Sequence, residues 1–173
     1  GKEHPDPTER LSLRRLTLDD VDLMLAVWND PAFIRYVGDR GIRTEEQGRK
    51  AMLEGPIMLY ENYGYGPYRL ALKQDDTAIG ICGIFRRDGL DEPDIGFSTL
   101  PEYCGRGFAY EAASAVIEYA RSDLGLSFLT AIVSPENAAS VGLIRKLGLS
   151  FERMYVWPDG DDEVAIYGMQ LID

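Results

Sequence analysis

The spacing of hydrophobic residues changes several times along the chain, between patterns typical of strands and patterns typical of helices. Alternating or continuous apolar runs predict strands, whereas apolar residues three or four positions apart predict the buried face of a helix. The predicted strands cover residues 11–13, 68–73, 78–85, 94–100, 127–133, 151–156 and 164–169, and the predicted helices cover residues 17–28, 44–53, 109–124 and 137–147. This order predicts an α+β (mixed α/β) fold with a mixed, mostly antiparallel sheet and helices on both faces.

The chain shows no internal repeat, low-complexity linker or domain boundary. Residues 1–9 are rich in proline and charge and are expected to form a flexible tail. Residues 10–173 are expected to form a single domain, which is long enough for a substantial core. The aromatic, glycine-rich stretch 60–68 is expected to be a loop. It either frames a substrate pocket or is anchored by packed aromatic side chains.

The net charge of −11 limits the partners that the protein can have. Nucleic-acid binding needs clustered Lys and Arg, so no nucleic-acid partner is expected. The acidic balance favours cationic partners such as amines, or it only improves solubility. No apolar run approaches the roughly 20 residues that span a membrane, and no secretory signal is visible. We therefore expect a cytoplasmic protein without a membrane partner.

Histidine and cysteine usage narrows the chemistry. The only histidine, His4, lies in the expected tail, which argues against a histidine triad, metal site or general base. The two cysteines, Cys82 and Cys104, do not have metal-ligand spacing, so no metal is expected. An acid or base must then be a carboxylate, a tyrosine, a cysteine, a backbone group or water.

The most informative segment is the glycine turn between the strand at 94–100 and the helix at 109–124. Here Gly105 and Gly107 flank Arg106. Two glycines let the backbone approach a ligand closely and turn its N–H groups in one direction. Because these groups lie at the positive end of a helix, they form an anion site suited to a pyrophosphate.

Three ordered segments resemble the GNAT superfamily of acyl-CoA N-acyltransferases, and within it the RimJ/RimL-like branch. The segments are Asp94-Ile95-Gly96-Phe97 with Pro101-Glu102-Tyr103, then Gly105-Arg106-Gly107-Phe108-Ala109-Tyr110-Glu111-Ala112, and finally Asn137-Ala138-Ala139-Ser140 with Lys146-Leu147-Gly148-Leu149. They span residues 94–149, and the predicted order of strands and helices extends the resemblance to nearly the whole chain.

The resemblance implies that the co-substrate is acetyl-CoA. Its pyrophosphate would be bound mainly through backbone N–H groups of Gly105, Arg106, Gly107, Phe108, Ala109 and Tyr110. The strand edge at Phe97, Ser98 and Thr99 would bind the pantetheine arm like an added strand. That strand would splay from the strand at 127–133, with the thioester in the gap. Asn137 would hydrogen-bond the pantetheine.

The same resemblance suggests catalytic residues. Ser140 would lie near the thioester sulfur, although it could also be a small residue packed in a helix. Asp94 is the candidate base, and the alternative is a solvent carboxylate at a strand end. Glu111 is better explained as a structural cap. Where many family members carry a tyrosine acid this chain has Ile144. Cys104 replaces the usual Gln, Arg or Trp of the family, and the lack of a neighbouring histidine argues against a role for it as a nucleophile.

These residues together predict an acetyl-CoA-dependent N-acetyltransferase. The acetyl group would pass to a primary amine, which is a protein N-terminus, an amino acid or a small amine, by direct attack in a ternary complex. Homodimers are common in the family, so a homodimer is possible. The first alternative is a catalytically weak acyl-CoA-binding or sensor module, and the second is an unrelated nucleotide binder, whose longer signatures are missing here.

Overall fold

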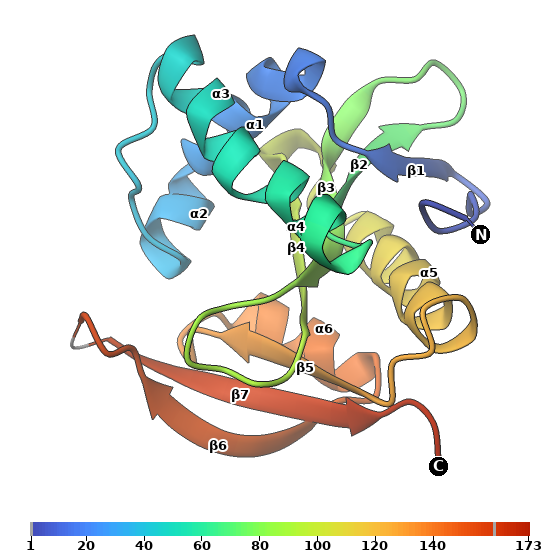
Figure 1. The fold of residues 1–173 in the computed structure, drawn as a ribbon, viewed down its shortest axis with the longest axis vertical. Helices are drawn as coiled ribbons and strands as arrows, with labels where there is room; N and C mark the ends of the chain where they lie inside the picture. The colour runs from blue at the N-terminus through green and yellow to red at the C-terminus, as the bar shows by residue number, and fades with distance from the viewer. Residues whose placement is uncertain (1, 161) are drawn as a thin grey trace.

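The computed structural model describes residues 2–160 and 162–173, and it contains the mixed sheet that the sequence predicts (Figure 1). The strand order is β1-β2-β3-β4-β5-β7-β6, and every neighbouring pair is antiparallel except the parallel pair β4–β5. The strands are β1 (Leu11–Arg15), β2 (Pro67–Leu72), β3 (Ala78–Phe85), β4 (Asp94–Thr99), β5 (Phe128–Val133), β6 (Ser150–Val156) and β7 (Glu163–Gln170).

The helices that capping residues predict are present. Thr17 and Thr44 each form a reciprocal capping box, and Asn137 accepts a hydrogen bond from the backbone of Ser140. The elements are η1 (Leu18–Asp20), α1 (Val21–Trp28), α2 (Pro31–Tyr36), α3 (Glu45–Glu54), α4 (Pro56–Tyr63), η2 (Pro101–Tyr103), α5 (Phe108–Ser122) and α6 (Ala138–Lys146). Over the described ranges, no helix has the length and apolar character that crossing a bilayer requires.

Two helices were missed because proline was interpreted only as a stop signal. Pro31 begins α2 and Pro56 begins α4, each in the first turn, where proline's fixed φ suits a helix and its missing N–H costs nothing. The expected loop at 60–68 is therefore wrong in part. Its first residues complete α4, which ends at the left-handed Gly64, and its last two residues begin β2.

Helices cover both faces of the sheet, as neighbouring residues of β3 show. Successive side chains of a strand point to opposite faces. Ile81 belongs to a core cluster with residues of α1 and α3, and Cys82 belongs to the larger cluster that contains the buried face of α5. The glycine turn at the start of α5 is thus carried by a helix that is firmly packed on the sheet.

Strands β4 and β5 meet at one point only. Their single pair in register joins Asp94 to Thr130, and the backbone N–H of Thr130 donates to the carbonyl of Pro93 at 3.0 Å. The register does not continue along the rest of β4, which confirms the splayed arrangement that the family resemblance implies. A parallel pair that diverges leaves the edge of the first strand without a ladder partner.

The segment 2–9, which was expected to be a flexible tail, has neither helix nor strand and lies against α5. The hydroxyl of Tyr119 on α5 donates to the carbonyl of Lys2 at 3.0 Å, and Pro5 is fully buried. At the other end of this segment, the Thr8 hydroxyl donates to the Glu111 carboxylate. The segment therefore runs along the helix that begins at the glycine turn.

Candidate functional site

The glycine turn (residues 105–107) connects η2 to α5, and the first residues of the helix, 108–110, follow it directly. Gly105 and Gly107 have φ angles of 74° and 82°, which lie in the left-handed region that glycine adopts without strain. Within the described residues, no protein acceptor hydrogen-bonds to the backbone N–H groups from Gly105 to Tyr110. A run of free N–H groups at a helix N-terminus is the arrangement that binds phosphate.

The edge of β4 lies next to this turn. Phe97, Ser98 and Thr99 pair with β3 on one side, and beyond Asp94 no register with β5 occupies the other side. The Thr99 hydroxyl contacts the Cys104 thiol at 3.3 Å, which ties the end of β4 to the glycine turn. An extended ligand arm could therefore add to the open edge and continue directly into the turn.

Helix α6 follows β5, the second strand of the splayed pair. Asn137 uses its Oδ1 to cap the helix at the backbone N–H of Ser140, 3.3 Å away, and the Ser140 side chain is half-buried. The Lys146 ammonium lies 4.3 Å from the centre of the Tyr110 ring, so α6 approaches the first turn of α5. Ile144 is 2% exposed and belongs to the core, where it supplies no acid.

Asp94 begins β4 at the point where the two strands meet. Its side chain is 2% exposed, and both of its carboxylate oxygens lie 3.2 Å from Nε of Arg87. Burial raises the pKa of Asp94 to about 6, although Arg87 opposes this shift. A carboxylate with a pKa near neutrality suits a general base, but here it lies behind Arg87 rather than at a solvent-exposed strand end.

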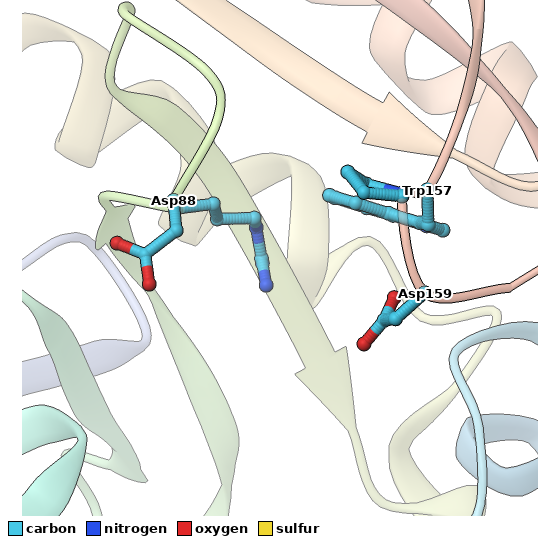
Figure 2. A pocket seen from close by; sticks show the side chains of 5 residues that line it. Asp88, Trp157 and Asp159 are labelled. Carbon is cyan, nitrogen blue, oxygen red and sulfur yellow. The ribbon is translucent and has the colours of Figure 1, made fainter.

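Arg87 connects Asp94 to a cavity of about 390 Å³ between the β3–β4 and β6–β7 loops, lined by Arg87, Asp88, Trp157, Pro158 and Asp159. Figure 2 shows Asp88 on one side of this cavity and Trp157 and Asp159 on the other. For the aromatic stretch 60–68 the structure favours the second alternative, because Tyr60, Tyr65 and Tyr68 are buried in the core, whereas Tyr63 is exposed. Among the described residues, no group of three or more His, Cys, Asp or Glu side chains could hold a metal ion.

Comparison with known proteins gives the family. The model of the acetyltransferase (GNAT) domain matches residues 10–150, which is most of the chain. The chain belongs to the GNAT acetyltransferase family. Two N-acetyltransferases of unassigned substrate are similar to this GNAT chain: p20 of Bacillus licheniformis, 30% identical over 84% of the chain and 82% of p20, and YoaA of Bacillus subtilis, 31% identical over 88% of each.

A solved structure shares the fold at lower sequence similarity. The ribosomal L7/L12 alpha-N-protein acetyltransferase RimL, in complex with coenzyme A, superposes with a TM-score of 0.81 and covers 98% of both chains at 19% identity. At this identity the likeness concerns the fold, which RimL and this GNAT domain share over nearly their whole length.

No prediction from the sequence concerned three residues near the candidate site: Arg10, Arg87 and Trp157. Arg10 donates from Nη1 to the carbonyl of Arg106 at 3.0 Å, although 96 positions separate the two residues. No local pattern indicates such a contact. For Trp157 a signal existed, because a tryptophan beside a polar hairpin turn is rarely placed there by core packing alone.

Proposed function

We propose that this protein is an acetyl-CoA-dependent N-acetyltransferase of the RimJ/RimL-like branch that acts on a primary amine. One observation carries the proposal: the run of free backbone N–H groups from Gly105 to Tyr110 continues from the open edge of β4. A pyrophosphate fits the first feature, and an extended pantetheine arm fits the second. The coenzyme A bound to RimL, which has the same fold, supports the assignment.

Different residues around the gap bind different parts of acetyl-CoA. The glycine turn holds the pyrophosphate, Phe97 to Thr99 hold the pantetheine arm, and Asn137 adds a side-chain hydrogen bond from the opposite side. When bound, acetyl-CoA supplies a thioester whose carbonyl carbon accepts the amine. Holding the amine and the thioester next to each other makes the attack effectively intramolecular, so a ternary complex needs no covalent enzyme intermediate.

Two side chains assist the reaction, one by accepting a proton and one by donating a hydrogen bond. Asp94 is ionised above about pH 6 and accepts a proton from the attacking amine, either through water or after Arg87 moves aside. Ser140 donates a hydrogen bond from Oγ toward the sulfur, where negative charge develops as the thiolate leaves. Because a thiolate is a tolerable leaving group, a hydrogen bond suffices and the tyrosine acid of many relatives, replaced here by Ile144, is dispensable.

The amine acceptor occupies the cavity beside Arg87. Asp88 and Asp159 supply carboxylates on its two sides, and Trp157 and Pro158 supply apolar surface. Carboxylates favour an acceptor that arrives as an ammonium ion, in agreement with the net charge of −11. Arg87 lines the cavity and pairs with the buried Asp94, which supports a role for Asp94 as the base for an acceptor bound there.

Replacing Ser140 by Ala tests the role of its hydroxyl. The turnover number should fall about tenfold, because one hydrogen bond to the developing thiolate is lost, while acetyl-CoA affinity stays nearly unchanged. Steady-state kinetics and calorimetry measure the two quantities. Ser122→Ala, at the far end of α5, removes a hydroxyl that bonds only Glu118 and serves as the control. Unchanged turnover in Ser140→Ala would remove Ser140 from the mechanism.

Calorimetric titration with acetyl-CoA, with ATP as the comparison ligand, tests the function itself. Selective binding of acetyl-CoA is expected, followed by release of the free thiol when a panel of primary amines is added. Absence of acetyl-CoA binding by well-folded protein would overturn the proposal. Equal binding of ATP would show that the turn recognises phosphates without regard to the acyl arm.

A second candidate is an acyl-CoA-binding module with little turnover. Two observations favour it: Ile144 is buried where relatives carry an acid, and the Asp94 carboxylate is engaged by Arg87. This candidate predicts acetyl-CoA binding without thiol release on any amine of the panel. The same two experiments therefore distinguish it from the enzyme.

A further inference from the structure

We infer that Arg10 is a positioning residue for cofactor binding, which orients a peptide of the glycine turn so that its N–H group faces the pyrophosphate. The inference rests on the acetyl-CoA site proposed above. Arg10 immediately precedes β1, and its Nη1 donates to the carbonyl of Arg106 at 3.0 Å. It reaches the turn from a part of the chain that the family motifs do not include.

The contact with Arg106 determines the direction of a neighbouring donor. In a planar trans peptide, the carbonyl oxygen of one residue and the N–H of the next point in opposite directions. When Arg10 holds the Arg106 oxygen, the N–H of Gly107 must point away from Arg10 and remain available to an anion. Gly107 itself restricts this peptide weakly, because glycine adopts both signs of φ with little difference in energy.

The Arg10 guanidinium is held firmly enough to act in this way. Its Nε donates to Oε1 of Glu111 at 2.7 Å, and the central guanidinium carbon, Cζ, lies 4.1 Å from the centre of the Phe108 ring. The backbone N–H of Arg10 also donates to Oε2 of Glu111 at 2.9 Å. The planar guanidinium thus joins the first turn of α5 to the glycine turn, because its two hydrogen bonds, to Glu111 and to Arg106, leave the group in fixed, different directions.

Glu111 is the anchor of this arrangement and stays ionised. Burial raises the pKa of its carboxyl, but hydrogen bonds from Thr8 and Arg10 outweigh that effect and hold the pKa below its usual range. Glu111 was expected to be a structural cap, and in the structure its carboxylate accepts hydrogen bonds from Thr8 and Arg10. The segment before β1 is therefore coupled to the proposed cofactor site.

Replacing Arg10 by Ala should raise the Kd and KM for acetyl-CoA about tenfold and leave the turnover number at saturation unchanged. Without Arg10 the backbone of the glycine turn is less ordered in the free protein, and the free energy needed to order it upon binding weakens the affinity for acetyl-CoA. S-acetylpantetheine, which lacks the pyrophosphate, serves as the comparison substrate. Its KM should not change, whereas general damage to the fold would raise both KM values.

Two further variants make the test specific. Arg10→Lys keeps a positive charge beside Glu111 but cannot also reach the Arg106 carbonyl, so it should lose most of the affinity that Arg10→Ala loses. Arg15→Ala is the matched control. Like Arg10, Arg15 makes two side-chain hydrogen bonds and stacks over an aromatic ring, in its case with the carbonyls of Glu3 and Gly64 and the ring of Tyr60, and it is not part of the proposed site. Its acetyl-CoA affinity should equal that of the parent protein.

The outcomes separate this inference from the proposed function. If the parent protein does not bind acetyl-CoA, the proposed function fails. If the parent binds and Arg10→Ala or Arg10→Lys binds equally well, only the role of Arg10 fails. An equal rise of KM for acetyl-CoA and S-acetylpantetheine would also overturn it, since the effect would then not involve the pyrophosphate.

Discussion

Replacing Gly107 by Glu should abolish measurable acetyl-CoA binding, with a loss of affinity of more than about hundredfold. Gly107 has a φ of 82°, which a residue with a side chain adopts only under strain. A Cβ at this position would lie 3.3 Å from Nη2 of Arg10, so the guanidinium would have to move. The new carboxylate would also repel the phosphates that the free N–H groups attract.

The control for this variant is Gly125→Glu. Gly125 has a similar φ of 65°, and a Cβ there meets no atom within 4 Å, in the connection between α5 and β5. The two variants share the added charge and the backbone strain, so calorimetry isolates the effect of position. Parent-like affinity in folded Gly107→Glu would place the cofactor elsewhere on the molecule.

Replacing Asp94 by Asn should lower kcat/KM about hundredfold or more, which is the usual contribution of a general base. In the parent protein, kcat/KM should decline as the pH falls through about 6, where Asp94 takes up a proton. Asparagine cannot accept the proton of the amine, so this decline near pH 6 should disappear from the pH profile of the variant. A parent-like rate for Asp94→Asn would exclude Asp94 as the base.

The same substitution should stabilise the protein at neutral and higher pH. The Asp94 pKa is about 6 in the folded protein and 3.8 ordinarily, so the folded state holds this proton more tightly. The resulting stability is present below about pH 4 and lost as the pH rises through about 6. At about pH 8, Asn should raise the free energy of unfolding by about 1–3 kcal/mol. The upper figure is the net cost of the buried charge with its pairing to Arg87 already included, and the lower figure allows for Arg87 losing its charged partner.

Asp20→Asn provides the opposite case for the unfolding experiment. Asp20 is also a buried carboxylate, but its bonds with Arg14 and the backbone of Thr17 outweigh burial and lower its pKa. Its stabilising effect is present at neutral pH and is lost in acid, so Asp20→Asn should destabilise the protein at about pH 8. If Asp94→Asn destabilised it to the same degree, Arg87 and Asp94 would form a structural ion pair rather than a poised base.

The comparison with the sequence shows which features local patterns determine. Apolar periodicity and the capping residues Thr17, Thr44 and Asn137 predicted the strands and four helical regions, because these signals act within a few residues. Pro31 and Pro56 were misinterpreted because proline both ends one helix and begins the next, and the sequence alone does not say which role it takes.

In the candidate site, too, local features were predictable from the sequence and long-range contacts were not. The glycine turn was predicted because its conformation depends on Gly105 and Gly107 themselves. The burial of Asp94, its contact with Arg87 and the reach of Arg10 to Arg106 depend on strand pairing and chain packing. Such long-range contacts leave no trace in the spacing of residues, and without them Asp94 resembles a carboxylate at the solvent-exposed end of a strand.

The two tryptophans differ in a way that is useful in practice. Trp28 is 4% exposed in the core, whereas Trp157 lines the cavity beside Asp88 and Asp159. Indole fluorescence responds to the polarity around the ring and to quenching by nearby groups, so a molecule entering the cavity changes the emission of Trp157 over a steady background from Trp28. The protein therefore carries its own optical reporter, with which amine libraries can be screened without labels and independently of catalysis.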